Sequence, residues 1–367
     1  MKVLLLGGTG TLSTTVLRCA LKKGYDITIM NRGSKNNLLP KEITSIICDF
    51  YNTEDVRQNF HSSNFDVVVD FLSRKPHDIE RIYPIFKDLC KQYIFISSAC
   101  VYRRGEGDFP IKETSPKPNP DWDYNIQKYE AEQKLMLLAK TSNSFYTIIR
   151  PYITYNDERI PLGIVPAYKY HRTIIERIRS GKPWFIWDGG NSLSTLTYAD
   201  ELAVGVVGLF LNEKAKNTDF HITSDYVYSQ KRIVKLLFEK LKMPQNIVEF
   251  SSEEIAENLP EYKGMLLGDR SLNAIFDNSK IKDAVPELVF NVSLEQGLDK
   301  ILAYWNDLST FDYDYKFDAR VDKLIGKKNN SVGFVKYPHS SANSKKTYLI
   351  NRYLPTKWAT LAMRHLV

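Results

Sequence analysis

The chain has 367 residues and a mass of 42.4 kDa, enough for one large or two ordinary domains. Its hydrophobic content of 43% and charged content of 25% exclude a largely disordered or fibrous protein. The net charge of +7 arises at one end, because residues 315–367 hold eleven Lys and Arg against two Asp and Glu. The rest of the chain is close to neutral, and this disfavours nucleic acid as a partner of the whole protein.

The spacing of cysteines and histidines and the length of the apolar runs limit the sites and the cellular location that we expect. The four cysteines form no CxxC pair and the six histidines are scattered, so we expect neither a disulfide framework nor a metal site. No apolar run approaches the roughly 20 residues that span a bilayer. The apolar run at the start of the chain is too short for a signal peptide. We therefore predict a cytoplasmic protein with no transmembrane segment.

Short apolar runs alternate with amphipathic stretches over the first 150 residues, which predicts an α/β fold with a doubly wound parallel sheet. The expected strands are residues 3–6, 27–30, 45–47, 67–69, 93–96 and 146–149. Helices are expected near residues 13–23, 53–60, 77–91 and 124–141. The proline-rich segment 110–121 is predicted to be a loop that borders the active site.

A glycine-rich turn follows the first expected strand and precedes a helix. The cofactor-binding residues predicted there are Gly7, Gly8, Thr9, Gly10, Thr11 and Leu12. Glycines let the backbone approach a pyrophosphate, which then binds the amides at the helix N-terminus. This placement is the context in which the motif indicates a Rossmann dinucleotide-binding fold. Ser13 stands at the third glycine position and could offer its hydroxyl to the phosphate.

Two further positions bear on the choice of cofactor. Asn31 and Arg32 follow the second strand, where a NAD-binding domain usually has an acid for the ribose. A guanidinium there suits a 2′-phosphate, so Arg32 favours NADP over NAD, the alternative being an exposed surface arginine. Asp49, after the third strand, is a candidate for the adenine amino group, with an ordinary turn residue as the alternative.

Three residues form the candidate catalytic group. Tyr124 and Lys128 lie one turn apart on an expected helix, and a nearby ammonium lowers the pKa of a tyrosine toward neutrality. Tyrosine can then act as a general acid or base for a hydroxyl or ketone. Ser98 follows the fifth strand, at the sheet edge where ligands of open α/β sheets bind. Tyr83 and Lys87 have the same spacing, but we interpret them as structural because they lie mid-helix between two strands.

The organisation that we predict has three parts. Residues 1–160 form the Rossmann dinucleotide-binding core, and further core elements can return from later in the chain. Residues 161–310 form a smaller substrate-binding lobe interleaved with the core, with a helix near 164–180. Residues 311–367 form a basic, aromatic C-terminal extension.

The extension has too many large aromatic side chains to be a free solvated tail, so we expect it to fold back onto the body or onto a neighbouring subunit. Its last segment, after Pro355, is predicted to be a short amphipathic helix. The apolar side of that helix is formed by Trp358, Leu361, Ala362, His365 and Leu366. Packing against protein is the preferred interpretation, and weak membrane association is the alternative.

Together these motifs resemble the extended and atypical branches of the short-chain dehydrogenase/reductase superfamily, of the nucleotide-sugar epimerase/dehydratase type. The resemblance is carried by the glycine turn, residues 97–102, Tyr124 and Lys128 with Glu132, Arg150-Pro151, residues 198–200 and residues 293–298. It implies that Ser98 polarises the substrate oxygen, that Tyr124 exchanges its proton and that Lys128 holds the nicotinamide ribose. It also implies hydride transfer at nicotinamide C4 and a homodimer.

Departures from the family pattern bear on the substrate. Ser194 stands where the resemblance implies an arginine for a substrate diphosphate, and Arg159, Arg172 and Arg270 are the candidate substitutes. Ala99 and Cys100 stand at the positions where 4,6-dehydratases carry a pair of acids, which disfavours dehydration as the reaction.

The function that we expect is that of an NAD(P)-dependent oxidoreductase or epimerase acting on a sugar or nucleotide-sugar carbinol or ketone. An NADPH-dependent ketone reductase on the same fold is one alternative. A non-catalytic RNA-binding protein on a Rossmann fold is the other.

Overall fold

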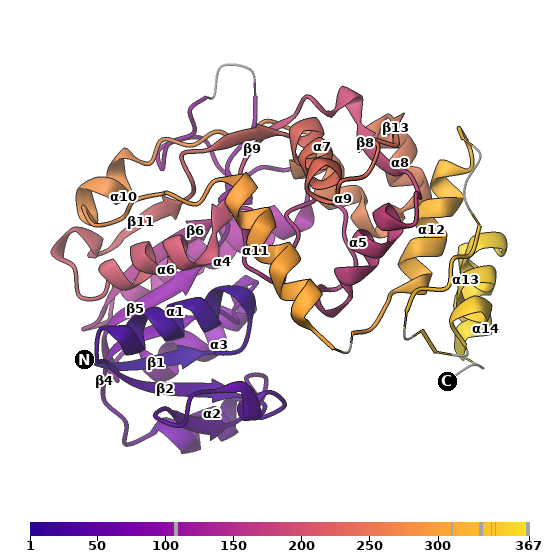
Figure 1. Cartoon of the computed structure of the whole chain (residues 1–367). Coiled ribbons are helices and arrows are strands. Elements are labelled where there is room, and N and C mark those ends of the chain that lie inside the picture. Colours follow the sequence, from indigo (N-terminus) through magenta and orange to yellow (C-terminus); the bar gives the residue numbers. More distant parts are fainter. Residues whose placement is uncertain (106–108, 310, 330–332, 339, 342, 365–367) are drawn as a thin grey trace. The chain divides into compact units, whose positions relative to one another are not determined.

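The computed structural model describes residues 1–105, 109–309, 311–329, 333–338, 340–341 and 343–364. The chain passes back and forth between two compact units (Figure 1). The first unit consists of Met1–Thr154, Thr195–Val227 and Ala274–Asn291. The second consists of Tyr155–Ser194, Tyr228–Asn273 and Val292–Val367, so the C-terminal extension belongs to it. The assignment of substrate binding to the second unit stays a prediction.

A seven-stranded parallel sheet forms the centre of the first unit and confirms the expected doubly wound fold. Its strand order is β11-β6-β5-β4-β1-β2-β3. The strands are β1 (Lys2–Leu6), β2 (Asp26–Asn31), β3 (Thr44–Ile47), β4 (Phe65–Asp70), β5 (Cys90–Ile96), β6 (Phe145–Pro151) and β11 (Thr218–Ile222). Strand β11 is not among the expected strands, because Thr218–Ile222 lies far from the others in the sequence and is not a continuous apolar run.

Helices cover both faces of the sheet (Figure 1). Because successive strand residues point to opposite faces, Val3 and Leu5 pack in one apolar cluster and Leu4 and Leu6 in another. The first cluster includes residues of α1 (Thr11–Lys22), α6 (Ala199–Gly208) and α10 (Ser279–Ala284). The second includes residues of α2 (Thr53–Phe60), α3 (Pro76–Phe86) and α4 (Asp123–Ala139).

One helix of the first unit is shorter than expected. The prediction of a helix over 77–91 was wrong at its C-terminal end, where α3 ends at Phe86. Cys90 begins β5 and pairs with Phe65 of β4, so the last residues of the expected helix belong to the sheet. The apolar run alone does not mark this boundary, because a buried strand and a buried helix end look alike in sequence.

The second unit is mainly helical and contains a small parallel pair of strands, β8 (Trp184–Trp187) and β13 (Ile247–Phe250). Its main helices are α5 (Arg172–Arg179), α7 (Gln230–Lys240), α8 (Ser252–Asn258), α11 (Leu294–Asp307), α12 (Tyr315–Ile325), α13 (Ser344–Tyr353) and α14 (Thr356–Arg364). The short elements of the chain are β7 (Thr154–Tyr155), β9 (Leu193–Thr195), β10 (Thr197–Tyr198), β12 (Val227–Ser229) and α9 (Lys263–Met265). The helix expected from residue 164 begins only at Arg172, because Pro166 disfavours a helical conformation at the residue before it.

A fully buried cluster of four charges ties α12 to α5 and to the loop before β8. Arg177 contacts Asp318 and Asp322, both at 2.7 Å, through its two terminal nitrogens. The Lys182 ammonium lies 2.6 Å from Asp318 and 2.8 Å from Asp322. Tyr348 of α13 donates a hydrogen bond of 2.5 Å to Asp322. Removing the extension would therefore leave two buried cations without their acids.

The aromatic residues of the extension divide between core and surface. Tyr337 and Tyr348 are buried with Tyr315, whereas Tyr353 and Trp358 are 68% and 61% exposed. Helix α14 covers the segment expected to be helical, and among its described side chains Ala359 is buried and Leu361 is exposed. Trp358 and Leu361 therefore do not pack on the body of their own chain, whereas packing against a neighbouring subunit stays a prediction. His365 and Leu366 lie outside the described residues.

Among the described residues, no helix combines the length and the apolar character required to cross a bilayer. In the same part of the chain the four cysteines are free thiols. No group of three or more His, Cys, Asp and Glu there is placed to hold a metal ion.

The buried charge cluster yields a stability prediction. Asp318→Asn should lower the free energy of unfolding by about 3–5 kcal/mol, because it leaves Arg177 and Lys182 facing a single carboxylate without water. Chemical denaturation of the full chain measures this. Asp312→Asn is the matched control, since Asp312 forms an exposed pair with Lys169 and should cost about 1 kcal/mol or less. Equal losses for the two variants would contradict a structural role for the cluster.

Candidate active site

The turn between β1 and α1 has the backbone shape that a pyrophosphate requires. Gly7 has φ +84°, and its amide donates 2.9 Å to the carbonyl of Met30. A Cβ on Gly7 would lie 2.7 Å from Leu72, and one on Gly8 would lie 2.5 Å from Ile29. Only glycine fits at these two positions, so the backbone itself forms the surface of the turn. The turn therefore fits a dinucleotide cofactor at the carboxyl edge of the sheet.

The rest of the motif begins the helix. Thr9 is half-buried in the turn, Gly10 caps α1, and Thr11 and Leu12 are its first two residues. The Ser13 hydroxyl accepts a hydrogen bond of 2.9 Å from the Gly10 amide and donates one of 3.3 Å to the Gly10 carbonyl. Ser13 thus fixes the turn internally, and its expected contact with a phosphate stays a prediction.

Arg32 lies at the same sheet edge as the glycine turn, because β1 and β2 pair in parallel with Leu6 opposite Met30. Its side chain is exposed. Asn31 shapes the loop: its oxygen accepts 2.6 Å from the Gly33 amide and its nitrogen donates 2.8 Å to Asn36. Asp49 is exposed and accepts 3.1 Å from the amide of Tyr51. Arg32 is thus the cationic group that follows the second strand, and the ribose and adenine contacts stay predictions.

Lys128 joins α4 to the ends of two strands. Its ammonium donates 2.8 Å to the carbonyl of Ser73 and 2.9 Å to the carbonyl of Ile96, the last residue of β5. The side chain is buried, and its nitrogen lies 4.7 Å from the centre of the Phe95 ring. Burial lowers the pKa of Lys128 to about 8, although Asp70 and Glu132 oppose the shift. No pattern in the sequence indicates the contact of Lys128 with Ser73.

Ser98 and Tyr124 lie on the two elements that Lys128 connects. Ser98 is buried two residues beyond β5, where its hydroxyl accepts 3.3 Å from the Cys100 amide and caps the 3₁₀ turn Ala99–Val101. Tyr124 is half-buried one turn before Lys128, with its ring 4.7 Å from that of Trp122. Since α4 packs against the Ala99–Val101 turn, the structure brings the three predicted catalytic residues to one edge of the sheet. Their catalytic roles stay predictions.

A buried ion pair holds α4 against the sheet. Glu132 and Arg150, on α4 and β6, are joined by two hydrogen bonds of 2.7 and 2.8 Å. Ser97 donates 2.5 Å to the same carboxylate. Glu132 follows Lys128 by one helical turn, so the two buried side chains fix one face of α4.

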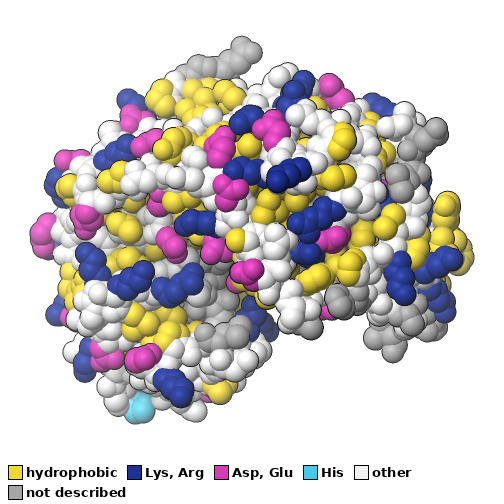
Figure 2. All heavy atoms as spheres, in the orientation of Figure 1, with side chains coloured by type: hydrophobic (Ala, Val, Ile, Leu, Met, Phe, Trp, Pro, Cys, Tyr) yellow, Lys and Arg dark blue, Asp and Glu magenta, His cyan; other side chains and the backbone are white. Residues whose placement is uncertain are grey.

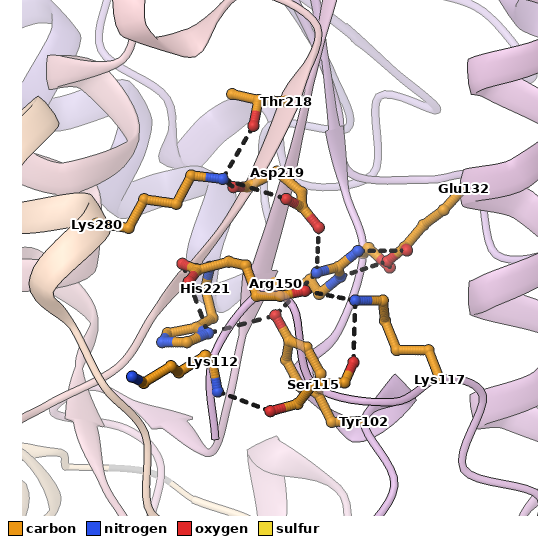
Figure 3. A network of polar contacts seen from close by, with 12 residues as sticks. Tyr102, Lys112, Ser115, Lys117, Glu132, Arg150, Thr218, Asp219, His221 and Lys280 are labelled. Atoms are coloured by element: carbon orange, nitrogen blue, oxygen red, sulfur yellow. Dashed lines mark hydrogen bonds and ion pairs between the residues drawn. The ribbon is translucent and has the colours of Figure 1, made fainter. Parts of the chain in front are cut away.

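The network around Arg150 extends to residues that the sequence did not mark (Figure 3). Arg150 donates 2.8 Å to the Tyr102 hydroxyl and lies 2.5 Å from Asp219. Nε2 of His221 lies 2.7 Å from the carbonyl of Asp277, and Nδ1 lies 3.3 Å from the Tyr102 hydroxyl. Burial lowers the pKa of His221 to about 4, so the ring is neutral and donates through Nε2. Its Nδ1 then accepts from Tyr102, which orients the Arg150 network.

Of the three arginines that are candidates for the diphosphate contact, Arg172 has a structural role. It donates to the Trp305 carbonyl, pairs with Glu176 at 2.8 Å and lies over the Phe311 ring. Burial lowers the pKa of Arg159, and the charge of Arg270 lowers it further, although Tyr168 opposes the shift. Arg159 lies over the Tyr168 ring, and Arg270 pairs with the buried Asp269.

Comparison with known proteins gives a family and a fold. The family model described as NAD dependent epimerase/dehydratase family matches residues 3–223. The chain is 26% identical over 267 residues to the chloroplast stem-loop binding protein of 41 kDa b from Arabidopsis thaliana, which covers 69% of this chain and 67% of that protein. It is 19% identical over 261 residues to 2′-dehydrokanamycin reductase from Streptomyces kanamyceticus, covering 71% and 72% of the two chains.

The fold is similar to that of UDP-glucose 4-epimerase from Thermotoga maritima, whose crystal structure contains UDP-glucose. The TM-score is 0.68 at 21% identity, with 83% of this chain and 99% of that chain covered. At this identity the likeness supports the fold alone.

The depressed pKa of Lys128 can be tested through stability. The pKa of a lysine in an unfolded chain is about 10.4, whereas the pKa of Lys128 in the folded chain is about 8. Between these values the unfolded state binds more protons, so the wild type should gain stability over Lys128→Met as the pH rises from about 8 to about 10. The gain should approach about 3 kcal/mol in urea denaturation.

The matched control for this prediction is Lys134→Met, which removes a lysine from the same helix and from a pair with Glu80 at 2.6 Å. A stability difference between the wild type and Lys128→Met that is flat over this pH range would contradict the depressed pKa.

Proposed function

This chain belongs to the NAD dependent epimerase/dehydratase family, and on that premise we propose that it oxidises and re-reduces a carbinol of a nucleotide sugar with Ser98, Tyr124 and Lys128 as catalytic residues. The observation that carries the proposal is the anchoring of Lys128 to the carbonyls of Ser73 and Ile96. This anchoring holds an ammonium at the carboxyl end of β5, between the helix of Tyr124 and the strand end of Ser98. The glycine turn after β1 lies at the same edge, where open α/β sheets bind their ligands.

The hydrogen-bond count of Lys128 supports its role. An ammonium has three N–H donors, and two of those of Lys128 donate to the carbonyls of Ser73 and Ile96. The third is available for a ribose hydroxyl of the cofactor. Below pH 8 the side chain is mainly charged, and its positive charge favours the phenolate form of Tyr124 one turn away.

The role of each group in the reaction follows from these positions. The cofactor supplies hydride exchange at nicotinamide C4. Tyr124 takes the proton from the sugar hydroxyl during oxidation and returns it during reduction. The Ser98 hydroxyl donates to the same substrate oxygen. Amides at Thr11 and Leu12, at the N-terminus of α1, bind the pyrophosphate.

Ser194, which stands where the family resemblance implies an arginine for a substrate diphosphate, is buried and uncharged. Arg172 is held by Glu176 and the Phe311 ring, and Arg270 pairs with Asp269. Of the three candidate substitutes, Arg159 therefore stays the one that we propose for the diphosphate contact.

A second candidate function is an NADPH-dependent ketone reductase. It is favoured by Arg32, whose exposed guanidinium is suited to the 2′-phosphate of NADP. The two functions differ in cofactor handling, because an epimerase regenerates its cofactor in each turnover and can keep it bound. A reductase must exchange it.

The catalytic assignment predicts a large effect of one hydroxyl. Tyr124→Phe should lower kcat by roughly 10²–10⁴-fold, because the proton transfer is lost, while cofactor binding stays nearly intact. Turnover of UDP-sugars and nucleotide content by mass spectrometry provide the two measurements. Tyr129→Phe on the same helix is the control and should retain activity. Full activity of Tyr124→Phe would overturn the assignment.

The cofactor assignment predicts a selective loss. Arg32→Gln should weaken NADPH binding by roughly tenfold or more and leave NADH binding unchanged, because only NADPH carries the 2′-phosphate. Lys35→Gln, in the same exposed loop, is the charge-matched control. Calorimetric titration of both nucleotides measures the effect. Stoichiometric NAD released on denaturing the purified wild type would instead favour the epimerase and show that Arg32 does not select NADP.

A further inference from the structure

The surface of the C-terminal extension is cationic for a structural reason. Residues 315–367 contain only two acids, Asp318 and Asp322. Both are fully buried against Arg177 and Lys182, which lie outside the extension. The eleven Lys and Arg of residues 315–367 therefore have no acid of that segment at the surface, and the exposed Asp312, which precedes it, pairs with Lys169.

Helices α13 and α14 also expose an unusual share of apolar side chains. Five of the fourteen large apolar side chains exposed in the described chain lie within residues 349–361. They are Leu349, Tyr353, Leu354, Trp358 and Leu361, and we name them the C-terminal apolar patch. Leu349 and Tyr353 are four residues apart on α13, and Trp358 and Leu361 are three apart on α14, so each pair shares one helix face.

Lysines flank this patch. Lys345 and Lys346 on α13 and Lys357 on α14 are exposed, and within the described residues none of them pairs with an acid. Lys345 lies one turn before Leu349, and Lys357 precedes Trp358. Figure 2 shows hydrophobic and basic side chains next to each other over these C-terminal helices.

A cavity lined by three cations and one acid lies against the same helices. It has a volume of about 160 Å³, and its charged lining residues are Lys316, Arg320 and Lys323 of α12 and Glu257 of α8. Ala359 and Thr360 of α14 also line it. Arg320 pairs with Glu261, so Lys316 and Lys323 supply the remaining positive charge. Burial lowers the pKa of Lys323, and the charges of Arg352 and Arg320 lower it further. Like charges gathered around a small cavity favour an anion such as a phosphate group.

We propose that α13 and α14 form a peripheral docking surface for a bilayer that contains anionic phospholipids. The C-terminal apolar patch enters the interface between headgroups and acyl chains, where Trp and Tyr are favoured. Lys345, Lys346 and Lys357 contact the headgroups, and the cavity beside α14 receives a headgroup phosphate. This surface is separate from the proposed catalytic function.

The chemistry of the patch favours lipid over the other occupants. Leucine side chains gain nothing from base stacking, so an RNA partner would leave Leu349, Leu354 and Leu361 unused. A second copy of the same face would bring its lysines against these lysines around a two-fold axis. An anionic bilayer satisfies both the apolar and the cationic groups.

The full-length protein is tested against vesicles of phosphatidylcholine alone and vesicles that also contain phosphatidylglycerol. We expect cosedimentation with the anionic vesicles only, weakened by salt. Trp184, Trp187 and Trp305 are buried, Trp122 is half-buried and Trp358 is exposed, so we expect a blue shift of tryptophan fluorescence on binding to come from Trp358. That shift should be absent in Trp358→Phe when fluorescence is compared with the wild type.

Variants at exposed positions keep the test independent of folding. Trp358→Ser with Leu361→Ser should reduce vesicle binding by roughly tenfold or more, and Lys345→Gln and Lys346→Gln by roughly fivefold each. Tyr51→Ser and Lys41→Gln, exposed positions of the first unit, are the controls and should bind as the wild type does. Lys323→Gln tests the cavity and should weaken binding to the anionic vesicles alone.

Three outcomes would overturn the proposal. One is equal binding, or none, to the two kinds of vesicle. Another is binding of inorganic phosphate, lost in Lys323→Gln, without any vesicle binding, which would assign the cavity to a free phosphate. The third is that Trp358→Ser abolishes binding of a single-stranded RNA or dissociates a dimer in size-exclusion chromatography while the wild type ignores vesicles.

Discussion

The buried pair of Glu132 and Arg150 is the interaction on which the first unit's site depends. Taking both charges out of water costs several kcal/mol per ion, and the pair offsets this with two short hydrogen bonds, a third from Ser97 and contacts of Arg150 with Tyr102 and Asp219. The pair fixes α4 to β6 in one register. Since Lys128 lies one turn before Glu132 on that helix, the same register delivers its ammonium to the ends of β4 and β5.

This arrangement explains why a lysine with a pKa of about 8 is tolerated in the interior. The carbonyls of Ser73 and Ile96 satisfy two of its donors, so the cost of burial appears as a shifted pKa. His221 is buried without a charge, because burial lowers its pKa to about 4. The His221 ring therefore stays neutral at neutral pH, whereas Lys128 loses its charge as the pH rises through about 8.

In the second unit, charge is sorted between interior and surface. Asp318 and Asp322 face inward to neutralise Arg177 and Lys182, whereas lysines of the same helices are exposed. These lysines are Lys316, Lys345, Lys346 and Lys357. A sequence count shows only the excess of eleven cations over two acids. The buried position of both acids turns that excess into a property of the surface, and it makes the extension part of the second unit rather than an appendage.

The sequence by itself determined the local features of this protein. Continuous apolar runs indicated six of the seven strands, and the glycine turn could be predicted because its motif stands directly between a strand and a helix in the sequence. The side chains that require glycine at positions 7 and 8 belong to Leu72 and Ile29, and only the folded chain shows those contacts. Tyr124 and Lys128 could be recognised because residues four apart share one face of a helix.

The tertiary structure alone decided what each buried charged or titratable group contacts. Lys128 donates to the carbonyls of Ser73 and Ile96. His221 bonds to the Asp277 carbonyl and to Tyr102, and Arg177 pairs with Asp318 and Asp322. Those partners are 32 to 145 residues away in the chain, and no local pattern encodes them, because a long-range pair is set by how strands and helices stack rather than by the residues beside it.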